Sequence, residues 1–516
     1  MFKQLCSIYL ILSVLIFCNA CTAPLPTAES VTGSDSAAAE GSAESRGILR
    51  LAHPLLWNGK ESLDPASPTQ FFSANSMLYD RLTRQDETGA SVPYLAASWS
   101  TNEEATEWTF ILRDGVTFHN GQPLTSADVA YTFAHILDPD TGSSAAATFS
   151  LITGTETPDD LTIIFQLAKA HADFPLLLSS LTAGIIPAKS GDTIGESGIG
   201  TGPFKLEHLD AEGTTVLIAN DDYWQGPPAL AGIEISGIAE AQARVLAAQS
   251  GQLDAVLAAT SAQADLFASD DSFTVLRFPS GRWTGLVMRT DTPPFDDVRV
   301  RQAMRLVADR QSIVDLVLDG AGTVTCDTPV GPNDIYRWNG DCPQDIEKAK
   351  ALLADAGYSD GLDVTLYASN ANPQLVPLAE VYQQQAAAAG INVTLEIRPA
   401  DGFWTEVWMV EPFFTTFWAE FPADEMLNMA WRSNAPWNES YYQNPALDQL
   451  LDEARQTLDF DARRQLYQDA QRMIAEDGGH LIPYHIDQFS IVSNKVSNMQ
   501  ARDLPYIDWH LISKSE

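Results

Sequence analysis

Hydrophobic and polar positions along this chain repeat with two periods, and together they predict one continuous mixed α/β body. Residues 108–119 contain two β-prone runs on either side of Arg113-Asp114-Gly115, which is typical of a hairpin. Thr125 and Asp128 form a capping box, and the apolar positions after it recur at helical spacing. This region therefore predicts a hairpin followed by a helix.

The later part of the chain has a more helical pattern. Asp297 is placed to cap a helix, and Gly320 lies just beyond the end that we expect for it. Asp345 is placed to cap another helix, which Gly357 would end. Each predicted helix carries its apolar residues on one side, so both are expected to pack on a core.

A βαβ unit and a helical hairpin are predicted further along. Leu362–Ala368 and Ile391–Ile397 alternate as strands, and the residues between them up to Ala389 are helix-prone. Because such crossovers are right-handed, the two strands are expected to pair in parallel. Residues 445–475 predict a helical hairpin in which Asp459 starts the second helix.

The first residues of the chain have the pattern of an export signal. The apolar run Leu5–Phe17 is too short to span a membrane stably. Ala20 directly before Cys21 resembles a bacterial lipobox, in which the signal is removed and the new terminal cysteine carries lipid. The alternative is a simple secretory signal that is cleaved near the same place. Residues 1–20 are thus expected to be a signal peptide, and 21–46, rich in small and polar residues, a disordered tether.

The charge of the chain narrows the range of partners. The 516 residues carry 68 acidic and 30 basic side chains, a formal net charge of -38, with 45% hydrophobic residues. Such a surface repels phosphate backbones, so nucleic acid is excluded as a partner. The same field concentrates cations, which favours a cationic or amine-bearing ligand, although acidity also serves solubility alone.

Cysteine usage indicates one disulfide and no metal site. Cys6 and Cys18 leave with the signal and Cys21 is the anchor, so Cys326 and Cys342 remain in the folded body. Outside the cytoplasm this pair is expected to form a disulfide. The eight histidines are scattered, without the spacing of a zinc site, so we expect no metal and no cofactor.

Several segments, in order along almost the whole mature chain, resemble those of one protein family. The longest is LRDGVTFHNGQPLTSADVAYTF, Leu112 to Phe133. The others are Ser62–Pro65, Leu78–Leu82, Pro93–Trp99, Gly200–Phe204, Asn220–Trp224, Pro294–Ala303 and Ala349–Tyr358. Through them the chain resembles the peptide/nickel/opine family, solute-binding family 5, of ABC-importer substrate-binding proteins. Dipeptide- and oligopeptide-binding proteins belong to this family.

The resemblance implies an α/β, periplasmic-binding-protein-like fold of two lobes with mixed sheets. The large lobe is expected to be discontinuous, with a subdomain around 72–195, and the second lobe to be inserted into it. The expected boundaries are 47–284 and 487–516 for the large lobe and 285–486 for the second lobe. Two crossover strands, near Trp283–Arg289 and Leu481–Ser490, are expected to form the hinge. Closing two lobes on a ligand removes it from water and strengthens its polar contacts.

A dense run of aromatic residues between Phe403 and Tyr442 supplies candidate ligand contacts. Rigid aromatic side chains stack on a ligand at little entropic cost, although each could equally belong to a lobe core. The candidates for ligand contact are Trp57, Trp404, Trp418, Trp437, Asn438 and Tyr441. Trp418 and Trp437 are favoured because they lie among polar residues without clean periodicity. Trp404 and Trp408 fit one buried helix face equally well.

Two acidic residues near Trp418 are further candidates. Family members commonly have a tryptophan followed closely by Asp-Pro, and in the peptide binders an aspartate of this region holds the amino group of the ligand. This chain reads Phe417-Trp418-Ala419-Glu420-Phe421-Pro422-Ala423-Asp424, without an Asp-Pro. Either Glu420 or Asp424 takes that role or the amine contact is absent. The alternative for each is a solvated surface carboxylate.

The resemblance implies an exported, lipid-anchored binding protein, periplasmic or at the cell surface, and not an enzyme. It would capture a small molecule or a peptide and deliver it to an ABC permease and ATPase, as a monomer that touches the membrane only through its anchor. One alternative is a binding protein that reports to a receptor, with the same fold and cleft. A secreted hydrolase is the other alternative, but no Gly-x-Ser-x-Gly elbow occurs and we expect no catalytic residue.

Overall fold

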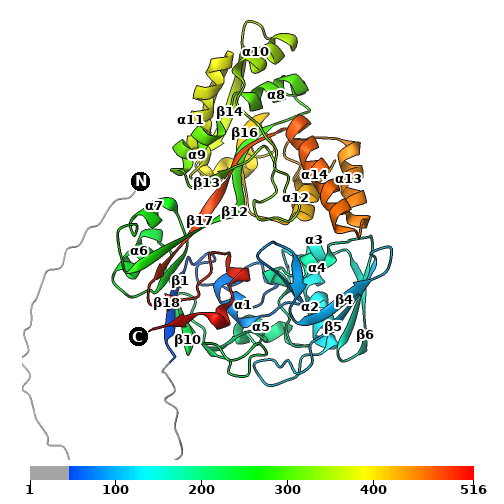
Figure 1. Cartoon of the computed structure of the whole chain (residues 1–516), viewed down its shortest axis with the longest axis vertical. Coiled ribbons are helices and arrows are strands. Elements are labelled where there is room, and N and C mark those ends of the chain that lie inside the picture. Colours follow the sequence, from blue (N-terminus) through cyan, green and yellow to red (C-terminus); the bar gives the residue numbers. More distant parts are fainter. Residues whose placement is uncertain (1–45, 516) are drawn as a thin grey trace, which may run out of the picture. The chain divides into compact units, whose positions relative to one another are not determined.

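The computed structural model of the chain describes residues 46–515 (Figure 1). The predictions for the signal peptide, for the lipidated Cys21 and for the tether up to residue 45 lie outside the described residues. Within 46–515, no helix combines the length and the apolar character needed to cross a bilayer. The same range holds no group of three or more His, Cys, Asp or Glu side chains suited to a metal ion.

The first lobe contains two four-stranded sheets. One has the order β1 (Ile48–His53), β10 (Gly232–Gly237), β9 (Thr214–Ala219) and β8 (Phe204–His208). The other has the order β4 (Ala96–Thr101), β5 (Glu107–Leu112), β7 (Thr162–Leu167) and β6 (Ile152–Asp159) and is antiparallel throughout. Alternate residues of β5, namely Trp108, Phe110 and Leu112, face the core of this second sheet.

Short helices and hairpins cover these sheets. They are α1 (Phe72–Leu78), β2 (Thr83–Gln85), β3 (Ser91–Pro93), α2 (Ser126–Leu137), α3 (Ala146–Phe149), α4 (Phe174–Leu177), α5 (Gly191–Ser197), β18 (Val496–Ser497) and β19 (Ser513–Lys514). The predicted capping box of Thr125 and Asp128 is present at the start of α2. Its apolar face, including Val129 and Phe133, is buried against the β4–β7 sheet.

A seven-stranded sheet forms the frame of the second lobe. Its order is β11 (Ala255–Ala259), β17 (His480–Ser493), β12 (Phe273–Met288), β16 (Phe413–Trp418), β14 (Leu362–Ser369) and β15 (Ile391–Arg398), with β13 (Gly322–Val324) added on β17. β14 and β15 pair in parallel and α11 (Leu375–Ala386) connects them, which confirms the predicted βαβ unit. The helix packs on the sheet through Leu378, Ala379 and Tyr382.

The remaining α-helices lie around this sheet, α6 and α7 near β1 and the others on the second lobe (Figure 1). They are α6 (Ala241–Gln249), α7 (Ser261–Asp265), α8 (Val298–Leu306), α9 (Arg310–Leu318), α10 (Ile346–Asp355), α12 (Ala423–Ala430), α13 (Pro445–Gln456) and α14 (Phe460–Asp477). Asp297, Asp345 and Asp459 each accept a hydrogen bond from a backbone N–H of the first turn that they precede. The helical hairpin of α13 and α14 is therefore confirmed.

The two predicted crossover strands are β12 and β17, and their pairing is confirmed. They pair antiparallel from Phe273 and Ser493 at one end to Val287 and His480 at the other, with an irregularity between Pro279 and Trp283. Figure 1 shows this long ribbon running from the first lobe into the second. The α/β fold class is confirmed, whereas the lobe boundaries remain predictions.

Two local predictions were wrong. Residues 116–119 do not pair with β5, because β5 already has β4 and β7 as neighbours, and Thr117 instead forms an isolated bridge with Pro123. The helix expected from Asp297 towards Gly320 is divided into α8 and α9, since Asp309 caps a new helix by accepting from the N–H of Ser312. In both places a long-range neighbour or a local cap outweighed the apolar spacing.

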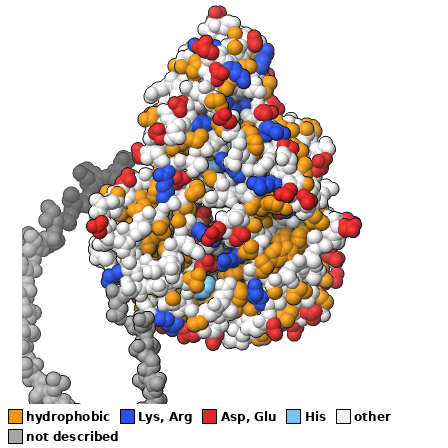
Figure 2. All heavy atoms as spheres, in the orientation of Figure 1, with side chains coloured by type: hydrophobic (Ala, Val, Ile, Leu, Met, Phe, Trp, Pro, Cys, Tyr) orange, Lys and Arg blue, Asp and Glu red, His pale blue; other side chains and the backbone are white. Residues whose placement is uncertain are grey.

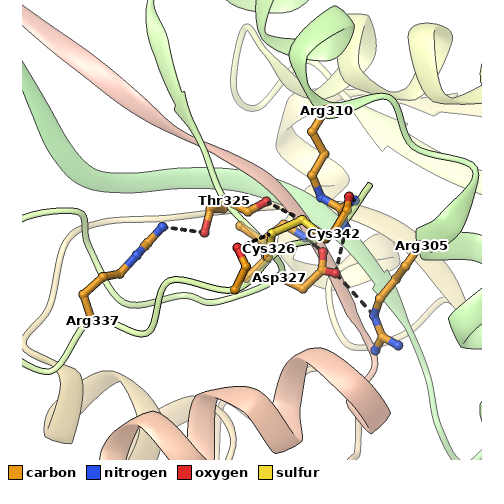
Figure 3. Close-up of a disulfide and its surroundings, with 9 residues drawn as sticks. Arg305, Arg310, Thr325, Cys326, Asp327, Arg337 and Cys342 are labelled. Atoms are coloured by element: carbon orange, nitrogen blue, oxygen red, sulfur yellow. Dashed lines mark hydrogen bonds and ion pairs between the residues drawn. A yellow bond between two sulfur atoms is a disulfide. The ribbon is translucent and has the colours of Figure 1, made fainter. Parts of the chain in front are cut away.

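A disulfide joins Cys326 and Cys342, whose Cα atoms lie 5.5 Å apart. Figure 3 shows Asp327 beside it, between Arg305 and Arg310. Arg310 pairs with Asp327 at 2.7 Å and also donates to the Cys342 carbonyl oxygen at 3.1 Å. The disulfide thus closes the loop 326–342, and Arg310 holds both ends of this loop against the body of the second lobe.

Candidate functional site

A cavity of about 500 Å³ lies where the two lobes face each other. From the first lobe and the crossover it is lined by Gln85, Asp86, Glu87, Gly89, Leu176, Phe278, Pro279, Gln500, Ala501, Arg502, Asp503 and Tyr506. From the second lobe it is lined by Gly331, Asn333, Asp334, Ile335, Glu420, Phe421 and Pro422. Figure 2 shows a hollow in this face with acidic side chains beside it. The volume suits a small solute.

The lining of the cavity is strongly acidic. Asp86, Glu87, Asp334, Glu420 and Asp503 contribute five carboxyl groups, and Arg502 is the one basic side chain among the lining residues. Carboxyl groups gathered in a confined space repel one another when ionised, so they either bind protons or attract a cation.

Glu420 lies two residues after β16 and reaches the hinge strand. Its Oε2 accepts a hydrogen bond of 2.8 Å from the N–H of Gly281, within the irregular part of β12. A Cβ atom on Gly281 would lie 2.5 Å from Cγ of Glu420, so this approach requires glycine. A Cβ on Gly331 would lie 2.9 Å from the Cα of Gly281. Two glycines thus let the crossover strand, the disulfide loop and Glu420 meet.

Three carboxyl groups of the cavity, those of Glu420, Asp503 and Asp334, resist ionisation. The surrounding protein keeps water away from the Glu420 carboxyl group, and Asp503 lies nearby with its negative charge. Both effects raise the pKa of Glu420, to about 7. Burial also raises the pKa of Asp503 above its ordinary value and that of Asp334 to about 6. Near neutral pH the ligand-free cavity therefore retains protons that a cation would displace.

A second buried carboxylate, Glu439, organises the aromatic part of the second lobe. Its Oε2 accepts hydrogen bonds from Trp408 Nε1 at 2.6 Å and Thr416 Oγ1 at 2.9 Å. Its Oε1 accepts from Trp418 Nε1 at 3.0 Å and lies 3.0 Å from His480 Nε2. All of these groups converge on one fully buried side chain, so Glu439 ties the loop after Trp437 to β16 and β17.

The predicted aromatic ligand residues divide between surface and core. Trp404 and Trp437 are 56% and 45% exposed, whereas Trp418 is 9% exposed. The Trp418 ring stacks on Trp283 and lies 5.9 Å from Trp437, centroid to centroid. Trp404 packs edge-on against Trp408, but its exposure shows that the alternative of one buried helix face is wrong for these two residues. None of these rings is among the residues that line the cavity.

The remaining predicted residues occupy different surroundings. Trp57 is exposed in a turn, and the ring of Tyr441 lies under the guanidinium of Arg289. Asn438 is buried and its side chain bonds the backbone of Tyr442 in both directions. Asp424 is buried in an ion pair with Arg455. Glu420 alone of the eight predicted ligand residues lines the cavity, and all eight remain predictions as ligand contacts.

Sequence reasoning missed most of the cavity wall. Asp503 and Tyr506 come from the C-terminal segment, and Asp86 and Glu87 from the turn between β2 and β3. Asp334 lies inside the disulfide loop, and the two cysteines were the only signal that could have drawn attention to it. The other segments carry no local pattern, because only the fold brings them together.

The fold and the cavity together define a class: two lobes joined by paired crossover strands, with a space between them for a small guest. The comparison with protein families identifies the group within that class. Residues 90–461 match the model described as bacterial extracellular solute-binding proteins, family 5 Middle. The chain therefore belongs to this family, as its sequence motifs indicated, and its relatives are binding proteins and not enzymes.

Relatives of known name cover much of the chain. Heme-binding protein A of Haemophilus influenzae is 29% identical over 63% of this chain, and the alignment spans 65% of that protein, just under two thirds of its length. The probable D,D-dipeptide-binding periplasmic protein DdpA of Escherichia coli is 27% identical over 87% of this chain and 89% of its own. The structure of HbpA2 from Haemophilus parasuis matches with a TM-score of 0.81 and 23% identity, covering 91% of this chain and all of the other. The structural match establishes the fold.

Proposed function

We propose that the protein is the extracytoplasmic substrate-binding protein of an ABC importer. It would capture a cationic or amine-bearing solute, peptides included, in the cavity between its lobes. Membership of the solute-binding family supports the first part of the proposal. The observation that carries the second part is the cavity itself, where Glu420 from one lobe and Asp503 from the other face the same space. A cation bound beside them would be attracted by a carboxyl group of each lobe at once and would therefore favour closure.

The name of one relative is consistent with an amine-bearing solute. The Escherichia coli relative is named for binding D,D-dipeptides, and dipeptides carry a free amino group. We propose that Glu420 takes the amine contact. Asp424 is the weaker alternative because Arg455 already neutralises it. We also propose that Cys21 carries the lipid anchor and that the binding protein acts as a monomer.

Isothermal titration of the purified protein with matched solutes tests this proposal. We expect heat of binding with free-amine dipeptides or other cationic solutes, and none with their N-acetylated, uncharged counterparts. Binding of the acetylated and free forms with equal affinity would contradict the cation part of the proposal. The absence of binding by any solute class, including opines, sugars and metal chelates, would contradict solute capture.

The affinity for a cationic solute is expected to depend on pH. A cation binds the ionised form of Glu420, and the pKa of that group is raised to about 7 in the ligand-free protein. Binding should therefore strengthen as pH rises from 6 to 8, by roughly tenfold, and level off above. Titration in buffers of different ionisation enthalpy should show proton release. Affinity that stays constant or falls over this range would contradict the prediction.

A further inference from the structure

The lobes touch at a second place besides the crossover strands. The residues concerned are Thr148, His171, Ala172 and Asp173 of the first lobe and Tyr336, Asp424, Glu425, Arg455 and Arg463 of the second. We propose that this set, called here the latch, is a reversible polar contact that holds the lobes together beside the cavity and breaks when they separate.

Asp424 forms one half of the latch. Arg455 donates to both of its carboxylate oxygens at 2.8 Å, and Tyr467 donates to one of them at 2.7 Å. These partners belong to the second lobe, so Asp424 is already compensated before the first lobe arrives. When the lobes meet, Nε2 of His171 from the first lobe lies 3.2 Å from Oδ2 of Asp424. This half of the contact can open without leaving a buried charge unpaired.

Asp173 forms the other half, and its compensation comes from the opposite lobe. Its Oδ1 accepts from the hydroxyl of Tyr336 at 2.7 Å and lies 3.1 Å from Nη2 of Arg463. Its other oxygen is buried and has no protein partner. Because burial without these two partners would be costly, Asp173 stays buried only while the lobes are together, and water replaces them when the lobes separate.

The rim of the latch adds two direct bonds between the lobes. The N–H of Ala172 donates to the carbonyl oxygen of Arg455 at 2.7 Å. Thr148 Oγ1 donates to Glu425 at 2.9 Å. In Figure 1, α3 and α4 lie beside the near end of α13, and these bonds join this part of the first lobe to α12 and α13. The amide of Ala172 is therefore a direct reporter of whether the latch is closed.

The composition of this contact suits a reversible joint. Within residues 46–515, no hydrophobic cluster combines side chains of the β4–β7 core with side chains of the core around Trp283 and Tyr336. Hydrogen bonds and ion pairs exchange for water at small net free energy, whereas an apolar seam would not. The lobes can therefore part here without exposing a core.

The latch borders the cavity. Leu176 lies three residues after Asp173, and Ile335 directly precedes Tyr336. Both line the cavity, as do Phe421 and Pro422, just before Asp424. Phe278 and Pro279 of the crossover form another part of the same wall. The cavity is thus framed by the hinge and the latch, so opening the latch would open a way in.

Hydrogen–deuterium exchange of the ligand-free protein tests the latch. Asp173→Asn removes the charge that pairs with Arg463, and we expect the amide of Ala172 to exchange at least tenfold faster while the amides of α2 keep their protection. The matched control is Asp327→Asn, because Asp327 is buried and paired with Arg310 entirely inside the second lobe. It should leave Ala172 unchanged.

Two results would overturn the proposal. One is unchanged exchange at Ala172 in Asp173→Asn. The other is faster exchange by the same factor throughout the first lobe, which would make the contact part of the permanent fold. If Asp173→Asn does not fold, Thr148→Val removes only the rim bond to Glu425 and should speed Ala172 exchange at least threefold. The measurement uses no solute, so its outcome is independent of the proposed cationic ligand.

Discussion

Replacing Glu420 by glutamine is expected to weaken the binding of a cationic solute by about 2 kcal/mol, roughly 30-fold in the dissociation constant. Glutamine keeps the size of the side chain and can still accept the hydrogen bond from Gly281, so the hinge contact should persist. What it loses is the negative charge of Glu420, which lies close to the carboxyl group of Asp503 in the cavity lining. Titration calorimetry of the wild type and the variant with the same solute measures the difference.

The variant should also lose most of the pH dependence between 6 and 8, because the group that titrates there is gone. Glu347→Gln is the matched control: Glu347 lies exposed on α10 of the same lobe, outside the cavity, and its replacement should leave affinity unchanged. Equal affinities of wild type and Glu420→Gln at pH 8, with both proteins folded, would remove Glu420 from the binding site.

Replacing Glu439 by alanine is expected to destabilise the protein by roughly 3–5 kcal/mol. The change leaves the buried donors of Trp408, Thr416 and Trp418 without their acceptor and opens a cavity beside His480. The urea concentration at the midpoint of unfolding, followed by tryptophan fluorescence, should fall clearly. The slope of the unfolding free energy against urea concentration should change little.

Glu476→Ala serves as the control, since Glu476 is an exposed residue of α14, and its effect should stay within about 0.5 kcal/mol. Glu439→Gln should be intermediate, because its amide retains one acceptor oxygen but adds a donor that faces other donors. If Glu439→Ala unfolds at the same urea midpoint as the wild type, the hydrogen bonds that converge on this carboxylate contribute little to the stability of the protein.

Local elements were predicted from the sequence where their signals are local. Caps such as Asp345 and Asp459 act within one turn of helix. The alternation of Leu362–Ala368 arises because one face of a single strand packs on the core. The hairpin after Leu112 failed because the neighbours of β5 come from distant segments. Periodicity reports which face of a segment is buried and does not report which strand lies beside it.

The candidate site was predictable only in part. Glu420 stood out because it lies close after Trp418, in the region where the resemblance to the family implies a contact with the amino group of a ligand. Asp503 and Asp334 were indistinguishable from the many solvated acids of a chain with 68 of them. The raised pKa of Glu420 arises from its surroundings and from the charge of Asp503, 83 residues away in sequence, and neither cause is visible in the local sequence.

By itself, the sequence determined the family, the α/β class, the crossover strands and the pair of cysteines, because these depend on short-range patterns and on residue types. Only the tertiary structure decided which carboxyl groups share the cavity and that Asp173 finds its compensation in Arg463 of the other lobe. Electrostatic free energy depends on distance and burial in three dimensions, so two acids of identical local sequence can be a solvated surface group or half of a joint.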